Sequence, residues 1–216
     1  MNKVLSVIAG LLIVGSAVAD DVVIYSENSW DTDGSPLVET IIDFTQYSQL
    51  QDVETWFAQN AESWIIEEVA GKEDINAFGW YVATEPTVLN EIFPGLASNG
   101  AYKSVVIDPP TDIGFYIKSG NEVFYTQSGL NAKNAGQDHI HQVAVFQNNT
   151  NSREFILAWE DISMKNGVTS KYNTTQSDGD FNDLVVRVRV PEPATLGFIG
   201  LSLLSLSGIS LIRRRK

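Results

Sequence analysis

The chain contains no cysteine among its 216 residues, and only two histidines, His139 and His141. The absence of cysteine excludes disulfide bonds, thiolate zinc sites, a catalytic thiol and a lipid-modified N-terminal cysteine. A domain without disulfide bonds is held together by its hydrophobic core, by bound ions, or by both.

Basic residues are also scarce, with 14 Lys and Arg against 27 Asp and Glu. The segment 20–190 keeps 9 of the basic and 26 of the acidic residues, so its net charge is −17 with histidine neutral. Such a surface repels phosphate backbones, which excludes nucleic acid as an expected partner. Divalent cations or cationic partners are the natural counterparts of this charge.

Residues 1–19 have the three-part organisation of a secretory signal peptide. Lys3 precedes an apolar run over residues 4–14, and small residues at Ala17 and Ala19 stand before Asp20. This pattern predicts cleavage by signal peptidase after Ala19. The alternative is a buried N-terminal helix of the mature fold.

The C-terminal residues predict a membrane anchor. Residues 194–212 carry no charge, and a helix of this length is about 28 Å long, close to the hydrocarbon thickness of a bilayer. The basic residues 213–216 follow directly and are expected to stay cytoplasmic, so the preceding domain is predicted to be outside the cell.

The sequence Val190-Pro191-Glu192-Pro193 stands immediately before this span. The order of Pro-Glu-Pro, apolar span and basic cluster resembles the PEP-CTERM sorting signal of exported bacterial proteins. The resemblance implies recognition by an exosortase-type membrane enzyme that removes the tail, with an inner-membrane intermediate followed by release to the cell surface or extracellular matrix. An ordinary single-pass anchor is the alternative. The residues that carry the implied signal are Pro191, Glu192, Pro193, Arg213, Arg214 and Arg215.

The segment 20–190 has the size of one domain, followed by a sorting segment over 191–216. Its short apolar runs, broken by Gly, Pro, Asn and Asp, predict an all-β fold, namely an antiparallel β-sandwich of jelly-roll type. Between residues 51 and 70 the apolar residues fall at spacings of three and four, which predicts one or two short helices.

Several strands can be placed individually. Residues 113–118 and 122–125 flank Ser119-Gly120-Asn121 and predict a tight hairpin, whereas Asp108-Pro109-Pro110 is expected to interrupt the chain before it. Residues 142–147 and 154–159 predict two further strands. The last strand begins at Leu184, where apolar residues alternate with Val185, Arg187 and Arg189.

An acidic cluster occupies residues 177–183, directly before that last strand. Oxygen ligands at alternate positions around Gly179 are typical of a calcium loop, although the spacing is not that of an EF-hand. If the strand that ends at Trp159 pairs with the strand that begins at Leu184, the pair Glu160-Asp161 joins the cluster. A plain turn whose short side chains cap backbone groups explains the residues equally well. The predicted calcium ligands are Glu160, Asp161, Asp178, Asp180, Asn182 and Asp183.

The motifs over residues 75–190 resemble a widespread bacterial extracellular domain of unknown function that often occurs in PEP-CTERM proteins. The resemblance implies a β-rich module with calcium binding and no catalysis. It favours the metal site over the plain turn. The motifs that carry it are Ala-Phe-Gly-Trp-Tyr at 77–81, Phe-Pro-Gly at 93–95, Gly-Phe-Tyr-Ile at 114–117, Asp138-His139, Trp-Glu-Asp-Ile at 159–162 and Asp-Gly-Asp-Phe-Asn-Asp-Leu-Val-Val at 178–186.

Enzymatic readings have little support in the sequence. Glu160 with Asp180 or Asp183 could form the carboxylate pair of a glycosidase, but the sequence sets no separation between them. No Gly-x-Ser-x-Gly motif is present to suggest a serine hydrolase. The first hypothesis is therefore a non-catalytic calcium-binding module of the cell surface or matrix, and a hydrolase is the weakest of three.

Histidine and tryptophan leave two further alternatives. His139 and His141 would share one face of a strand, where structural roles are more frequent than zinc ligation. Five tryptophans are many for this domain and make a polysaccharide-binding module the second hypothesis. Most of them are expected in the core, with Trp30 as the residue predicted to be exposed.

Overall fold

The structure is a computed structural model of the whole chain, and it describes residues 41–50, 53–68, 75–131, 141–163, 179 and 181–191. The predicted signal peptide, the predicted strand at 22–25, the Trp30 loop and the span 194–212 lie outside these residues. In the described part, no helix is both long and apolar enough to cross a membrane.

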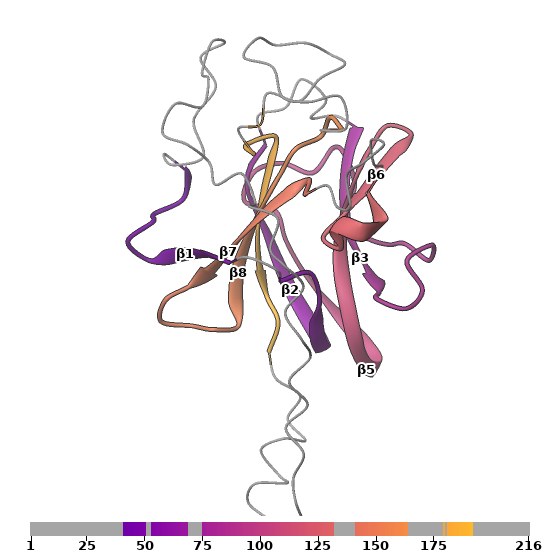
Figure 1. The fold of residues 1–216 in the computed structure, drawn as a ribbon, viewed down its shortest axis with the longest axis horizontal. Helices are drawn as coiled ribbons and strands as arrows, with labels where there is room; N and C mark the ends of the chain where they lie inside the picture. The colour runs from indigo at the N-terminus through magenta and orange to yellow at the C-terminus, as the bar shows by residue number, and fades with distance from the viewer. Residues whose placement is uncertain are drawn as a thin grey trace, which may run out of the picture.

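The described residues form one antiparallel sheet of nine strands (Figure 1). Along the sheet the order is β1, β7, β8, β9, β2, β5, β3, β4, and β6 pairs with β5 beyond the part that pairs with β2. The strands are β1 (Tyr47–Leu50), β2 (Trp56–Glu68), β3 (Asn76–Val82), β4 (Asn90–Phe93), β5 (Tyr102–Ser119), β6 (Glu122–Tyr125), β7 (Val143–Asn148), β8 (Glu154–Trp159) and β9 (Leu184–Arg189), with the 3-10 helix η2 (Ser128–Leu130) after β6.

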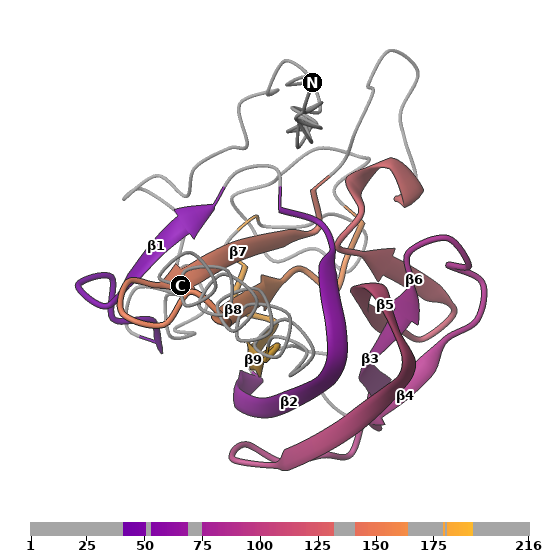
Figure 2. The same ribbon diagram turned by 90° about the horizontal axis from the view of Figure 1, so that it is seen from below.

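The prediction of an antiparallel all-β domain is confirmed, but the strands belong to one continuous sheet and not to two separate ones. Figure 2 shows β2 curving between the group β1, β7, β8, β9 and the group β3, β4, β5, β6. The Trp56 ring lies 5.3 Å from Phe115 of β5 and 5.4 Å from Phe155 of β8. The bend therefore brings both groups onto one shared hydrophobic core.

The prediction of helices over residues 51–70 is wrong, because residues 56–68 form strand β2. The pairing of β2 shifts register between Ala58 and Asn60, which is the signature of a β-bulge. The extra residue places Ala58 and Ala61 on the same buried side, three positions apart. A bulged strand therefore produces the spacing of three that a helix would also produce.

The predicted interruption at Asp108-Pro109-Pro110 is also wrong, since β5 runs through it from Tyr102 to Ser119. The partners of β5 on β2 are interrupted there instead, between Val106 and Thr111. The hairpin around residues 119–121 is confirmed, with Ser119 opposite Glu122.

A second, smaller apolar cluster covers the outer face of β7 and β8. Phe44 stacks on Phe146 with ring centroids 5.4 Å apart, and Phe181 reaches the same cluster from the loop before β9. This cluster therefore anchors Phe181, three residues before the start of β9.

Candidate functional site

The acidic edge is the end of the sheet at which β8 stops and β9 starts. Trp159 pairs with Leu184, so the expectation that these two strands are neighbours is confirmed. Glu160 and Asp161 follow β8, and Asn182 and Asp183 precede β9. The strand pairing therefore brings together four of the six predicted ligands, whereas Asp178 and Asp180 lie outside the described residues.

The acidic side chains at this edge are deeply buried. Glu160 is 0% exposed, Asp161 2% and Asn182 3%, while Asp183 is partly exposed. Burial of a carboxylate is costly unless hydrogen bonds or an opposite charge compensate for the lost hydration. Two adjacent buried carboxylates are therefore the most unusual chemical feature of the described domain.

Backbone N–H groups supply part of that compensation across the two strands. The Phe181 N–H donates to Glu160 Oε1 at 2.6 Å, and the Asp161 N–H donates to Asp183 Oδ2 at 2.7 Å. Hydrogen bonds of this kind, with an ionised acceptor, are shorter and stronger than neutral ones. Each carboxylate thus ties its own segment to the segment on the other side of the edge.

The loop before β9 is held in an uncommon backbone conformation. Gly179 has φ +78° and Phe181 has φ +55°, which is rare for a bulky residue. The Phe181 ring is buried in the outer apolar cluster while its N–H is bound by Glu160. Packing and the buried carboxylate together hold Phe181 in this conformation, and Asp183, two residues later, accepts the N–H of Asp161 after β8.

Asn76, the first residue of β3, belongs to the same edge although the sequence did not indicate it. Its Nδ2 donates to Asp161 Oδ2 at 2.9 Å, across 85 positions of sequence. Its Oδ1 is buried and has no hydrogen-bond partner in the described structure. Both atoms belong to one planar carboxamide, so an unpartnered oxygen lies beside a buried carboxylate.

The donor atoms of the acidic edge are oxygens, which suit a hard cation such as Ca²⁺. The described residues by themselves contain no group of three or more Asp, Glu, His or Cys that could hold a metal ion. A complete coordination sphere would therefore need the amide oxygens of Asn76 and Asn182 or residues of the segment 164–178 and Asp180.

His141 precedes Gln142, whose carbonyl accepts a hydrogen bond from the Glu160 N–H at 3.0 Å, so its backbone borders the acidic edge. His141 lines a small cleft together with Glu54 and Thr126 at the start of β7, while His139 lies outside the described residues. Glu54 accepts hydrogen bonds from the N–H and hydroxyl of Ser128, at 2.9 Å for the N–H. The His141 side chain thus contributes to this cleft, and among the described residues it forms no metal-binding cluster with the predicted ligands.

The aromatic motifs at 77–81 and 114–117 have a structural explanation. Gly79 pairs with Tyr116 and Gly114 pairs with Tyr81, so each tyrosine lies across from a glycine. A Cβ on Gly114 would stand 2.3 Å from the Tyr81 ring, and one on Gly79 would stand 2.6 Å from Tyr116. Burial raises the pKa of both phenols to about 12. These motifs therefore contribute to the packing of the sheet.

Residues 90–191 match the family model described as Domain of unknown function (DUF4114), so this part of the chain is a DUF4114 domain. The matched range contains the strands from β4 to β9 and all four described residues of the predicted ligand set. Strands β1, β2 and β3, and with them Asn76, precede it. No curated protein and no solved structure matches the chain.

Proposed function

We propose that the acidic edge binds calcium and that the protein is a non-catalytic module of the cell surface or extracellular matrix. The observation that carries the proposal is the pair Glu160 and Asp161, both buried, beside the buried and unpartnered Oδ1 of Asn76. An oxygen that accepts no N–H next to buried carboxylates is in the environment that a divalent cation provides.

The proposed ligands are the side-chain oxygens of Glu160, Asp161, Asn182 and Asp183, with Asp178 and Asp180 from the sequence motif. Such an ion would join the end of β8, the start of β9 and, through Asn76, the start of β3. In a protein without disulfide bonds, such an ion would stabilise the fold by linking segments that are distant in the sequence.

Thermal unfolding of the full chain in detergent, with calcium and with chelator, tests the proposal. An ion that binds only the folded state stabilises it by about 2.7 kcal/mol at a hundredfold excess over its dissociation constant. We expect calcium to raise the melting temperature of the wild type, and Asp183→Asn and Asp180→Ala to lose most of that rise.

Glu85→Gln is the matched control, because Glu85 is an exposed carboxylate after Val82, beyond the end of β3 opposite Asn76. This variant should keep the full response to calcium. A wild-type melting temperature that is the same in millimolar calcium and in chelator would reject the calcium site.

The non-catalytic part of the proposal is supported by the burial of Glu160. A general acid or base must reach its substrate within hydrogen-bond distance, and Glu160 has no exposed surface. Its Oε1 is also already bound to the Phe181 N–H. Turnover of a polysaccharide by the wild type that Glu160→Gln abolishes, with unfolding unchanged, would establish a hydrolase instead.

We further propose export by signal peptidase cleavage after residue 19 and sorting by an exosortase-type enzyme. The support is in the sequence alone: the signal-peptide pattern of residues 1–19 and the PEP-CTERM-like order of residues 191–216. In a host with such an enzyme, the mature protein should leave the inner membrane for the surface or matrix. Replacement of Pro191, Glu192 and Pro193 by alanine should trap it in the membrane, and unchanged release would reject the sorting signal.

A further inference from the structure

A group of aromatic and charged side chains lies on the outer face of β9, β2 and β5, away from the acidic edge. We call it the outer platform and define it as Glu62, Trp64, Tyr102, Arg187 and Arg189. Trp64 pairs with Arg187 on one side and with Tyr102 on the other, and Glu62 pairs with Arg189. Cross-strand pairing thus sets these side chains in two adjacent rows.

The first row is a three-membered stack. The Arg187 guanidinium carbon lies 4.5 Å from the centroid of the Trp64 ring, and the Tyr102 ring lies 4.9 Å from Trp64 on the neighbouring strand. Arg187 Nε is buried and has no hydrogen-bond partner. The contact of the guanidinium with the face of the indole ring therefore replaces a hydrogen bond. The stack fixes the orientation of both rings before any ligand arrives.

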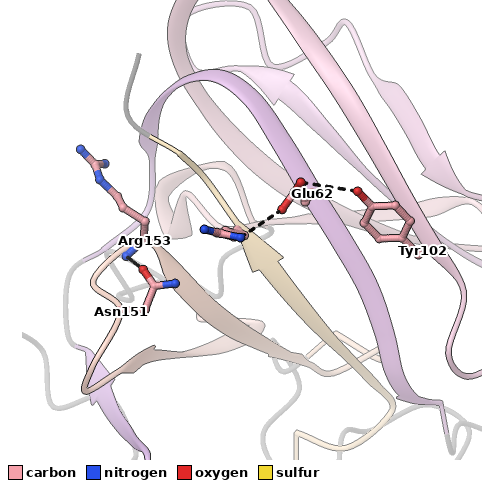
Figure 3. A network of polar contacts seen from close by, with 5 residues as sticks. Glu62, Tyr102, Asn151 and Arg153 are labelled. Carbon is pink, nitrogen blue, oxygen red and sulfur yellow. Dashed lines mark hydrogen bonds and ion pairs between the residues drawn. The ribbon is translucent and has the colours of Figure 1, made fainter. Parts of the chain in front are cut away.

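The second row is polar and open to solvent. Glu62 lies between two partners, with the Arg189 guanidinium at 3.8 Å and the Tyr102 hydroxyl at 3.5 Å (Figure 3). Tyr102 is 53% exposed, and the side chains of Arg189 and Glu62 are 51% and 29% exposed. Because these contacts are long, the Glu62 carboxylate, the Arg189 guanidinium and the Tyr102 hydroxyl can also form hydrogen bonds with a ligand beside the aromatic stack.

Packing of the fold does not account for the platform. Ser63, Ile65 and Val188 of the same strands face inward and are buried, while the platform residues belong to neither hydrophobic cluster. Isolated exposed contacts of this kind contribute little to stability. A row of oriented aromatic rings beside a row of charged hydrogen-bonding groups is therefore better explained by a ligand.

The chemistry of the platform fits a carbohydrate chain. The apolar face of a sugar ring packs on an aromatic ring, and its hydroxyls both donate and accept hydrogen bonds, as Glu62 and Arg189 require. Neighbouring strands are about 4.8 Å apart, close to the length of one pyranose ring, so successive sugars can meet successive strands.

The charge of the platform and of the whole chain favours neutral over anionic carbohydrates. The two arginines and Glu62, together with Glu154 opposite Arg189 on β8, make this part of the surface close to neutral. The chain as a whole has a net charge of −13, which repels polyanions. We propose that the outer platform binds a neutral polysaccharide, with the exposed ring of Tyr102 as the stacking residue, Trp64 as the residue that holds that ring in place, and Glu62 and Arg189 as the hydroxyl-binding residues.

Affinity electrophoresis and pull-down of the full chain in detergent test this proposal, in chelator so that the calcium site plays no part. The probes are cellulose, chitin, laminarin, dextran and galactomannan, with alginate as the anionic comparison. We expect at least one neutral polysaccharide to retain the wild type, and Tyr102→Ala to weaken retention roughly fivefold or more. Arg189→Gln, which leaves both rings in place, should also weaken it.

Phe57→Ala is the matched control, because Phe57 is an aromatic residue of β2 that is 47% exposed and seven positions from Trp64. It should retain wild-type binding, and melting temperatures measured in parallel identify any variant that fails to fold. Retention by none of the neutral polysaccharides, or by alginate alone, overturns the proposal. Equal losses in Tyr102→Ala and Phe57→Ala would overturn the placement of the site on the platform.

Discussion

The outer face of strand β5 carries two groups of aromatic residues that behave in opposite ways. Near its C-terminal end, Tyr116 is 3% exposed and its neighbour Tyr81 on β3 is fully buried. Near its N-terminal end, Tyr102 is 53% exposed beside a partly exposed Trp64. Both groups lie on the same side of one sheet, so the type of residue does not explain the difference.

The cross-strand partner explains it. Tyr81 and Tyr116 lie opposite glycines, and each ring lies flat over the space where a side chain would be. Trp64 lies between Arg187 and Tyr102, so its ring has no such space to enter. An aromatic residue on this sheet is thus buried or exposed according to the residue across from it.

The largest expected effect comes from filling the glycine space. Gly114→Ala places a Cβ 2.3 Å from the Tyr81 ring, and overpacking of this kind costs about 3 kcal/mol. Urea unfolding should show this loss, whereas Gly129→Ala, whose Cβ would meet nothing within 4 Å, should leave stability nearly unchanged. Equal stability of the two variants would contradict the account of the glycine–tyrosine pairs.

The second-largest effect should be a loss of stability at alkaline pH, caused by the two buried tyrosines. Burial raises the pKa of Tyr81 and Tyr116 to about 12, above the value of 10 for an unburied phenol. Below pH 10 both states of the protein keep these protons. Between pH 10 and about 12 the unfolded chain loses protons that the folded chain retains, so the free energy of unfolding falls as pH rises.

Urea midpoints measured from pH 8 to 11 check this dependence. The double variant Tyr81→Phe and Tyr116→Phe has no titrating phenol at these positions and should lose less stability than the wild type over that range. A double variant with the full wild-type loss would show that other groups cause it.

The smallest effect is expected in the outer platform. The contact between Arg187 and Trp64 should contribute about 0.5–1 kcal/mol, because cation–π pairs near the surface are weak. A double-mutant cycle of Arg187→Met and Trp64→Leu measures this coupling in urea unfolding. A coupling energy of several kcal/mol would mean that the platform is a structural element like the glycine–tyrosine pairs.

Much of the fold could be predicted from local patterns. The alternation from Leu184 to Val190 and the hairpin at residues 119–121 were found because each depends on neighbouring residues alone. The helices predicted over residues 51–70 were wrong because a bulge in β2 shifts its buried side by one residue. A bulge depends on the register against β5, which no local pattern reports.

The candidate site divides in the same way. The motifs around Glu160 and residues 181–183 were found together because they flank two strands that proved to be paired. Asn76 was missed, since it reaches Asp161 across 85 positions and no motif connects them. Trp64 was expected among the core residues. Its partial exposure could not be predicted, because it follows from the bulge and from its partners on β9 and β5.

By itself, the sequence determined the all-β class, the acidic character and the residues that flank the last strand. These follow from composition and from alternation, which are properties of neighbouring residues. Only the tertiary structure decided that the strands form one bent sheet, that Asn76 joins the acidic edge and that Trp64 meets Arg187 and Tyr102 on the outside. Those outcomes depend on strand order and register, which are set when distant segments compete for the same hydrophobic core and backbone hydrogen bonds.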